Sequence, residues 1–379
     1  MIRDLFQHLK SIRRDLHKNF AERSGEEFRT AEQIRTYLQQ HTNAQIINVA
    51  NTGTIAVFES DVPGKTIMIR ADIDALPISE SNTFDHQSIN AEVSHKCGHD
   101  GHTTILLGLA RMLEEQPPEK GTVILLWQPA EENGMGAKAV IEDRKFQQYK
   151  IDETYALHNL PGYPLGQILY KSGAFTANVK SLIIDLKGKT AHAAEPEHGH
   201  NPAYTIAAIL SYAQELINNK PNEQDFYLIT PVYLEAGSKD YGIAAGAGSL
   251  HLTIRSWSPE IFARQTQRLT DFVDHICQEQ NATVTYSWTQ EFWTNNNDKK
   301  AVAVIKQSAD DLGFSKQELS APFKWGEDFG LFTQSIPGAM FGIGAGEDCP
   351  ALHNPDYDFP DEIIVPAVRM FHQILTHAL

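Results

Sequence analysis

Apolar residues recur at three- and four-residue steps near the start of the chain, a spacing that places them on one face of a helix. Two helices are therefore predicted there, the second after a capping-box pattern at residues 24–27. Similar spacing predicts further helices at residues 104–113 and 363–374. The apolar positions of the two opening helices are Leu5, Leu9, Ile12 and Leu16, then Phe28, Ala31, Ile34 and Leu38.

Short apolar runs with strand character alternate with these helices. Such alternation is typical of an α/β fold, so we expect a largely parallel mixed sheet with helices on both faces. The runs lie at residues 54–58, 66–69, 123–127, 155–157 and 339–343.

The middle of the chain has a different pattern. Four strand-like runs alternate with two helical stretches, which predicts a small α+β sandwich inserted into the larger domain. Residues 1–178 and 290–379 are expected to form the larger domain, and residues 179–289 the insertion. The runs are residues 179–186, 225–232, 249–254 and 282–288, and the helices are residues 202–217 and 259–278.

The composition argues against two classes of binding partner, nucleic acid and membrane. A net charge of -16 argues against a nucleic-acid-binding surface, which is usually basic. No apolar run is long enough to span a bilayer, and the first residues lack a continuous apolar segment of secretory type. Three scattered cysteines do not form a disulfide framework. We therefore expect a cytoplasmic protein that binds neither nucleic acid nor membrane.

Residues 95–102 (HKCGHDGH) bring three imidazoles, a thiol and a carboxylate together. A lone Cys is usually a small buried hydrophobe, and a lone His is usually an ordinary core or surface residue. So many potential ligands in eight residues instead favour a metal centre.

Other potential ligands follow the predicted strands. Asp72 and Asp74 come after the second run, Glu131 and Glu132 after the third, and His158 after the fourth. Sites in open α/β sheets form outside the carboxyl ends of the strands, so these residues are predicted to share one crevice. A Gly-rich loop after the last run is expected to bring His353 to the same edge.

Each acidic pair alone is more simply a turn or a solvated loop. Five ligand-bearing segments together favour one or two metal ions, with Zn, Ni, Co or Mn suiting the ligand types. One of two adjacent glutamates can then hold metal while the other moves a proton, although spacing alone does not order them. Hydrolysis of an amide or ester is the natural reaction, with Asp72, Asp74 and Asp100 orienting imidazoles.

Rival signatures do not fit. The His-Glu-x-x-His motif and the Pro-Cys-x-x-Cys half of the zinc deaminase pattern are absent. The glycines of residues 342–346 have the wrong spacing for a dinucleotide loop.

Five motifs occur in order along the chain: residues 70–77 (RADIDALP), 97–102 (CGHDGH), 128–132 (QPAEE), 157–161 (LHNLP) and 352–355 (LHNP). Together they resemble the successive signatures of the aminoacylase/carboxypeptidase metallopeptidase family. The Cys-x-His form is similar to its amidohydrolase branch, which includes hippurate hydrolases, N-acetyldiaminopimelate deacetylases and auxin–amino acid conjugate hydrolases. Weaker similarity extends to residues 13–17 and 326–329.

The resemblance implies a ligand set for two divalent metal ions and makes Glu131 the general base, with Asp74 counted among the catalytic residues. It also implies that the insertion is a ferredoxin-like lid, often the dimer contact, whose His192 reaches a substrate oxygen. Arg255 is retained as a carboxylate anchor. The chain departs from the usual pattern of the branch at two places. Residues 240–244 replace an Asn-Val-Ile-Pro segment, and residues 17–20 replace a His-Pro-Glu-Leu segment. The implied metal ligands are Cys97, His99, Glu132, His158 and His353.

We therefore predict a homodimeric, metal-dependent amidohydrolase that cleaves the N-acyl bond of an N-acyl amino acid or similar small molecule. A carboxypeptidase or dipeptidase of the same family is the alternative reaction. A non-catalytic metal or amino-acid binding protein is the alternative of another class. The adjacent Glu131 and Glu132 argue against the last, because a binding site needs a ligand but no base.

Overall fold

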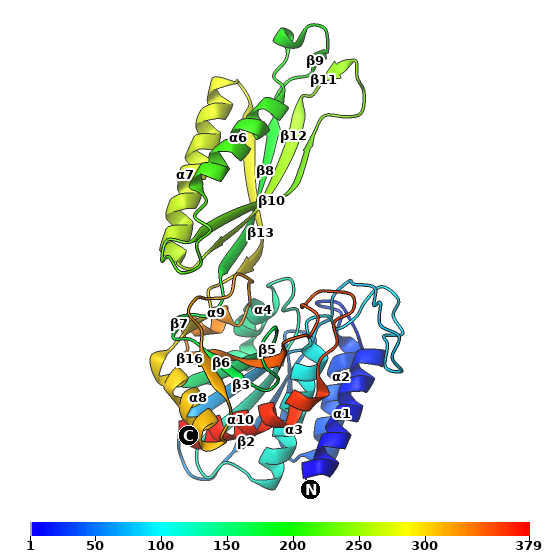
Figure 1. Ribbon diagram of the computed structural model, residues 1–379, viewed down its shortest axis with the longest axis vertical. Helices are drawn as coiled ribbons and strands as arrows, with labels where there is room; N and C mark the ends of the chain where they lie inside the picture. The colour runs from blue at the N-terminus through cyan, green and yellow to red at the C-terminus, as the bar shows by residue number, and fades with distance from the viewer. Residues whose placement is uncertain (1) are drawn as a thin grey trace. The chain divides into compact units, whose positions relative to one another are not determined.

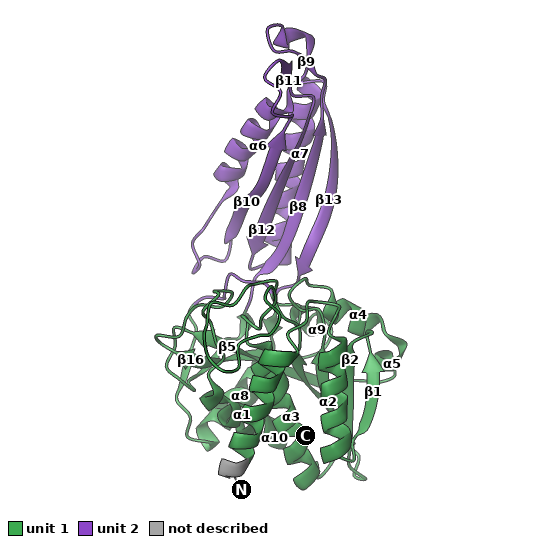
Figure 2. Ribbon diagram, turned by 90° about the vertical axis from the view of Figure 1, so that its right-hand side faces the viewer, with its two compact units in different colours: residues 1–175, 295–320, 327–379 green, residues 176–294, 321–326 purple. Residues whose placement is uncertain are grey.

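The computed structural model describes residues 2–379, and the chain forms two compact units (Figure 2). Unit 1 comprises residues 1–175, 295–320 and 327–379, and unit 2 comprises residues 176–294 and 321–326. The predicted insertion, residues 179–289, falls within unit 2. Unit 2 also takes residues 321–326, which pattern alone did not assign to it. The main-chain N–H of Ala177 donates to the Trp325 carbonyl at 3.1 Å, which ties this second segment to the first.

Unit 1 is built on an eight-stranded sheet with the spatial order β1-β2-β4-β3-β5-β16-β6-β15 (Figure 1). The central strands β4, β3, β5 and β16 pair in parallel, whereas β1 and β2 pair antiparallel at one edge. The predicted largely parallel mixed sheet is thus confirmed. The strands are β1 (Gln45–Val49), β2 (Gly53–Glu59), β3 (Thr66–Asp72), β4 (Thr122–Gln128), β5 (Glu153–Pro161), β6 (Ile168–Tyr170), β15 (Lys316–Glu318) and β16 (Gly338–Gly346).

Helices cover both faces of this sheet. Five of them share one apolar core with the strand residues Val123, Leu125 and Trp127. The alternate residues Ile124 and Leu126 are also fully buried, so the opposite face is covered as well, where α4 packs on β4. The five are α1 (Ile2–Asn19), α2 (Phe28–His41), α3 (His99–Glu115), α8 (Lys299–Asp311) and α10 (Ile364–Ala378). The shorter elements are α4 (Gly136–Glu142), α5 (Arg144–Gln147), α9 (Gly330–Thr333), η2 (Asp361–Ile363), β7 (Gly173–Ala174) and β14 (Asn296–Asn297).

The parallel strands place their carboxyl ends along one edge of the sheet. β3 ends at Asp72, β4 ends at Gln128, and β5 carries His158 near its end. Chain segments that leave these ends therefore meet at the same edge, as the sequence pattern predicts.

Unit 2 is a four-stranded antiparallel sheet, order β10-β12-β8-β13, whose core includes residues of α6 and α7. Its buried side chains alternate along the strands: Leu250, Leu252 and Ile254 face the helices. The two helices and four strands of the predicted α+β sandwich are present. The elements are β8 (Asn178–Lys187), β9 (Ala191–His192), η1 (Pro196–His198), α6 (Pro202–Leu216), β10 (Tyr227–Ala236), β11 (Ile243–Ala244), β12 (Ala247–Ser256), α7 (Pro259–Glu279) and β13 (Thr283–Phe292).

The predicted capping box at residues 24–27 is wrong. The Ser24 hydroxyl donates to Asp74 Oδ2 at 2.6 Å instead of capping a helix. The carboxylate of Glu22 accepts the first N–H groups of α2, from Arg29 and Thr30. The Glu27 side chain is not needed to cap α2, because Glu22, which lies upstream of the motif, already accepts N–H groups at the start of this helix.

Among residues 2–379, the three cysteines form no disulfide bond. No helix in that range combines the length and apolar character needed to cross a membrane.

Candidate metal centre

Cys97 and His99 flank Gly98, the residue that directly precedes α3. Gly98 has φ 95°, a left-handed conformation that residues with a β-carbon seldom adopt. A β-carbon there would also lie 2.6 Å from Oδ1 of Asn159. The glycine thus permits the sharp turn that brings the thiol and the imidazole to one end of the helix.

His99 is oriented through one ring nitrogen. Its Nδ1 lies 2.9 Å from the carbonyl oxygen and 3.1 Å from Oδ1 of Asp74. Its Nε2 is buried and has no hydrogen-bond partner among residues 2–379. Burial would lower the pKa of His99, but the charge of Asp72 and the hydrogen bond to Asp74 outweigh it and raise the pKa to about 10.

The loop after β4 carries Glu131 and Glu132, and main-chain hydrogen bonds hold it in place. Ala130 has φ 52°, and its N–H donates to the carboxylate of Glu27 at 2.9 Å. The N–H of Glu132 donates to Asp74 Oδ2 at 3.0 Å. Asp74 therefore connects the His99 ring to the glutamate loop, an arrangement suited to orienting ligands.

Glu132 faces the same space as His99. Its Oε1 lies 3.8 Å from Nε2 of His99 and has no hydrogen-bond partner among the residues described. Burial raises the pKa of Glu132 to about 8, with His99 opposing the shift and Asp74 adding to it. A buried carboxylate oxygen without a partner is costly, so a cation is the natural occupant of this space.

Glu131 lies close to Glu132 and also to the carboxylates of Glu327 and Asp328. Its Oε1 accepts the main-chain N–H of Asp328 at 3.3 Å. Burial, followed by the charge of Glu327, raises the pKa of Glu131 well above its usual value, while Arg70 acts in the opposite sense. A base with a raised pKa is suited to holding a proton at neutral pH.

Cys97 Sγ lies 3.5 Å from Nε2 of His158, whose Nδ1 is 2.8 Å from the Asn159 carbonyl. Burial and the charge of Glu132 raise the pKa of the Cys97 thiol well above its usual value. A metal ion reverses this preference, because a coordinating thiol is deprotonated.

His353 reaches the site from the loop between β16 and η2. It has φ 65°, and its N–H donates to the Lys96 carbonyl at 2.8 Å. Its Nε2 lies 3.6 Å from Oε2 of Glu132, and its side chain is half exposed. It is the most open of the five predicted ligands.

The five predicted ligands therefore converge, and their geometry fits metal ions. Their donor atoms form overlapping triads in which all atoms lie within 4.8 Å of one another. Zn–N bonds of about 2.0–2.1 Å and Zn–S bonds of about 2.3 Å imply neighbouring ligand atoms about 3.3–3.7 Å apart in a tetrahedral site. The triads are Cys97, His99 and His158; Cys97, Glu132 and His353; and His99, Glu131 and Glu132. Because the first two share Cys97, the arrangement suits two adjacent ions.

Two further side chains at the site, His102 and Arg70, were not among the predicted site residues. His102 lies 2.6 Å from Asp72 and 2.5 Å from Oδ1 of Asn159. Arg70 is fully buried and donates to Asp72 and Asp328 at 2.7 and 2.8 Å. The spacing of His99 and His102, three residues apart at a helix start, was a usable signal, because such residues share one helix face. No comparable signal pointed to Arg70.

Unit 2 holds the two remaining predicted residues. His192 is exposed on β9, where its Nδ1 accepts the N–H of Ala194 at 3.0 Å. Arg255 donates to the Lys324 carbonyl at 2.7 Å, and burial lowers its pKa. Both belong to unit 2, whereas all five predicted ligands and Glu131 belong to unit 1.

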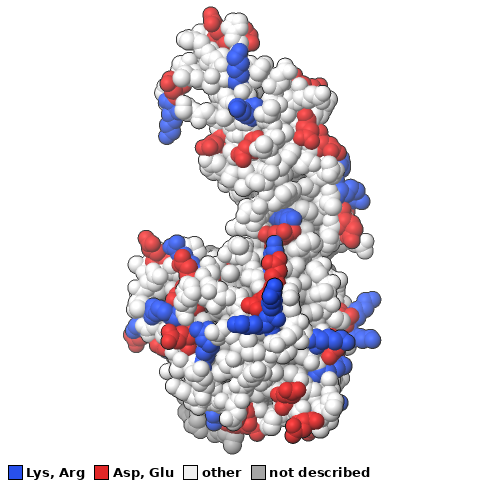
Figure 3. All heavy atoms as spheres, turned by 180° about the vertical axis from the view of Figure 1, so that it is seen from behind, with Lys and Arg blue, Asp and Glu red and all other residues white. Residues whose placement is uncertain are grey.

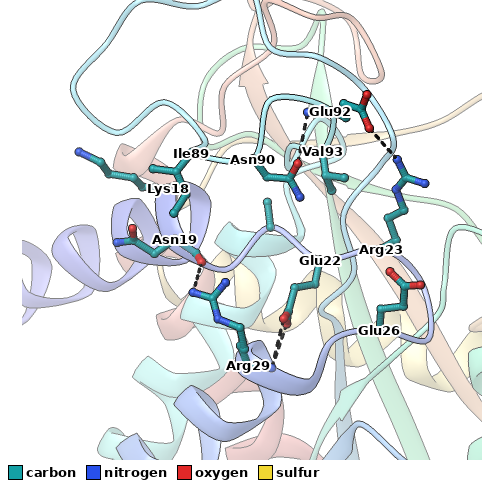
Figure 4. A pocket seen from close by; sticks show the side chains of 11 residues that line it. Lys18, Asn19, Glu22, Arg23, Glu26, Arg29, Ile89, Asn90, Glu92 and Val93 are labelled. Carbon is teal, nitrogen blue, oxygen red and sulfur yellow. Dashed lines mark hydrogen bonds and ion pairs between the residues drawn. The ribbon is translucent and has the colours of Figure 1, made fainter.

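A separate polar hollow of about 320 Å³ lies between the end of α1 and residues 89–93 (Figure 4). Its charged side chains bond neighbouring residues: Glu22 accepts from the Arg29 N–H, and Arg23 lies 3.9 Å from Glu92. It contains none of the predicted ligands. On the molecular face in Figure 3, acidic and basic side chains are interspersed.

The chain matches the family model described as peptidase family M20/M25/M40 over residues 68–377. It is 31% identical to an N-acetyldiaminopimelate deacetylase of Exiguobacterium sibiricum, covering 94% of this chain and 95% of the relative. It is also 31% identical to an N-acetyl-L-cysteine deacetylase of Bacillus subtilis, in a match that covers 97% of this chain and 88% of the relative. A crystal structure of a Bacillus subtilis protein described as a dinuclear metal-binding peptidase of the M20 family superposes with a TM-score of 0.86. That match is 27% identical in sequence and covers 100% and 99% of the two chains.

Proposed function

The chain belongs to peptidase family M20/M25/M40 and is a metal-dependent hydrolase of amide bonds, and on this premise we propose that its substrate is an N-acyl amino acid. The predicted family resemblance is confirmed. The curated relatives are named for deacetylation of N-acetyldiaminopimelate and N-acetyl-L-cysteine, which supports removal of a small acyl group here.

We assign one ion to Cys97, His99 and His158, and a second to Cys97, Glu132 and His353. The observation that carries metal binding here is a pair of buried atoms, Nε2 of His99 and Oε1 of Glu132, which lie 3.8 Å apart and have no hydrogen-bond partner among residues 2–379. The triads of donor atoms divide the ligands between the two ions. Thiolate, imidazole and carboxylate together suit Zn, Ni, Co or Mn.

When bound, divalent ions supply a Lewis acid for the amide carbonyl and lower the pKa of water. Glu131 then accepts a proton from water and delivers it to the departing amine nitrogen. Its raised pKa suits this shuttle, since the carboxyl group must retain the proton until the amine leaves. Asp74 keeps His99 and the main chain of Glu132 in place.

Unit 2 supplies the remaining polar contacts in this proposal. Because Nδ1 of His192 accepts a hydrogen bond, the neutral ring carries its proton on Nε2 and can donate to a substrate oxygen. Arg255 is proposed to attract the substrate carboxylate. A homodimer, action of His192 across it, and a cytoplasmic location stay predictions.

Metal-free protein loaded separately with Zn²⁺, Mn²⁺, Co²⁺ or Ni²⁺ is tested against N-acetyl amino acids and against dipeptides. We expect hydrolysis of N-acyl amino acids with at least one metal. Hydrolysis of dipeptides alone would favour the carboxypeptidase or dipeptidase reaction. Tight metal binding without turnover of either class would favour the non-catalytic binding protein.

A further inference from the structure

Lys96 is a fully buried lysine next to the proposed metal ligands, and it takes no part in the proposed chemistry. An ammonium group in a protein interior is costly unless its donors are paired. Here Nζ contacts the Glu80 carboxylate, Oδ1 of Asn82 at 2.9 Å and the Tyr357 carbonyl at 2.7 Å. These three acceptors match the three N–H donors of the group.

The acceptors come from two loops that lie far apart in the sequence. Glu80 and Asn82 belong to the segment between β3 and α3, and Tyr357 belongs to the segment between β16 and η2. Neither loop is held along its length by a sheet or helix. One side chain therefore joins two irregular segments, the second of which also carries His353.

The main chain of Lys96 makes a second connection to the His353 loop. Its carbonyl accepts the N–H of His353 at 2.8 Å, while its Nζ reaches the carbonyl of Tyr357. The N–H of Tyr357 in turn donates to the Asn354 carbonyl at 3.1 Å. Residues 353–357 are thus bonded at both ends to a single residue, and that residue directly precedes Cys97.

His353 depends on such support. Its left-handed conformation is disfavoured for a residue with a β-carbon, so surrounding contacts must maintain it. Its side chain is half exposed, unlike the buried rings of His99 and His158. Packing therefore fixes the His353 ring less than it fixes the other two.

We propose that Lys96 is a positioning residue that places His353 beside Cys97 and thereby sets the affinity of the metal position formed by Cys97, Glu132 and His353. The inference rests on the ligand set of the proposed function. It concerns one of the two metal positions, because the Lys96 ammonium group bonds Glu80, Asn82 and the carbonyl of Tyr357, and the Tyr357 segment is the one that carries His353.

Glu80 offers a matched control. It also lies 3.0 Å from Nε2 of His17 and accepts the Ser88 N–H at 2.8 Å, so it keeps partners without Lys96. Glu80→Gln removes the charge pair but leaves the bond from Lys96 to Tyr357. Lys96→Met removes that bond while keeping an unbranched side chain of similar length. Lys65→Met removes an exposed lysine, paired with Glu153 at 2.7 Å, from the same unit.

The experiment measures Zn²⁺ bound per chain, by mass spectrometry of the metal after equilibrium dialysis, and the two dissociation constants, by competition with a chelator. We expect Lys96→Met to keep one ion at wild-type affinity and to bind the other about 10–100-fold more weakly, the usual scale for groups that orient ligands. His353→Ala should show the same selective loss. Glu80→Gln and Lys65→Met should each retain two ions with affinities close to wild type.

Two wild-type affinities in folded Lys96→Met, or equal weakening of both ions, would overturn the proposal. If Lys96→Met does not fold, Lys96→Arg replaces it, since Arg keeps the charge but cannot place one nitrogen among the three acceptors. Weaker binding of only one of the two Zn²⁺ ions by Lys96→Arg would support the proposed positioning role. Wild-type affinity for both ions would overturn it. Zn²⁺ binding does not depend on the substrate, so this test and the substrate screen can fail separately.

Discussion

The two units present their predicted functional residues in opposite ways. In unit 1, six predicted residues from four chain segments converge, and the donor atoms of each triad lie within 4.8 Å of one another. In unit 2, His192 is exposed on a two-residue strand, and Arg255 is bonded to a main-chain carbonyl of its own unit. Unit 1 therefore gathers its candidate metal ligands in one place, whereas the two predicted residues of unit 2 are not part of these triads.

The difference has a physical cause. Parallel strands fix the direction and position of each chain segment that leaves them, so the sheet places His158 on β5 and Glu132 in the loop after β4. The β9–β11 pair carrying His192 has only two residues in each strand, and no core residue of the larger cluster in unit 2 lies on it. Removal of metal should consequently change the properties of unit 1 and leave those of unit 2 unchanged.

Metal removal should have the largest effect. Chelation should abolish amide hydrolysis, and added Zn²⁺ or Co²⁺ should restore it. Calorimetry should show a lower unfolding temperature for unit 1 alone, because the ions neutralise carboxylates buried there, while unit 2 keeps its separate apolar core. An equal fall in the unfolding temperatures of both units would contradict a metal site confined to unit 1.

His192→Ala should lower kcat by roughly 100-fold or more, the scale for loss of a donor to a developing oxyanion. Bound metal should stay at the wild-type level, since no ligand is removed. His251→Ala, in the same unit, serves as the control. Mixed dimers of His192→Ala and Glu131→Gln would regain activity if His192 acts across a dimer. A normal rate in His192→Ala would remove this residue from the reaction.

Asp74→Asn should weaken metal binding about 10–100-fold, because Asp74 orients His99 and the main chain of Glu132. Saturating Zn²⁺ should restore most of kcat. A kcat that stays low at saturating metal would instead assign Asp74 a direct part in the chemistry. Asp185→Asn in unit 2, where the carboxylate accepts from Ser249 at 2.7 Å, should leave metal affinity unchanged.

Arg255→Gln should have the smallest effect, a rise in KM of less than about 10-fold with kcat preserved. One N–H of this guanidinium is already used by Lys324, which limits what it offers a substrate. Kinetics with N-acetyl amino acids and with their amides distinguish the roles. An equal rise in KM for both would contradict a carboxylate contact.

The sheet and the gathering of candidate ligands at one of its edges follow from local sequence patterns, whereas the choice of five ligands among these candidates came from the family resemblance. Apolar runs locate the strands, and the residues after them must lie at one edge of the sheet. The capping box failed because Ser24 and Glu27 have tertiary partners, Asp74 and Ala130, that no local pattern reveals. The same applies to Arg70 and Lys96, whose partners are up to 261 residues away. Buried ion pairs between distant loops leave no periodic signal in the sequence.

The division of labour between Glu131 and Glu132 is the central claim, and parallel measurement of bound metal and kcat in two variants tests it most directly. Glu131→Gln should keep both ions and lose at least about 100-fold in kcat, because only the base is removed. Glu132→Gln should lose metal. Loss of metal in Glu131→Gln with full metal content in Glu132→Gln would contradict the assignment and reverse the two roles.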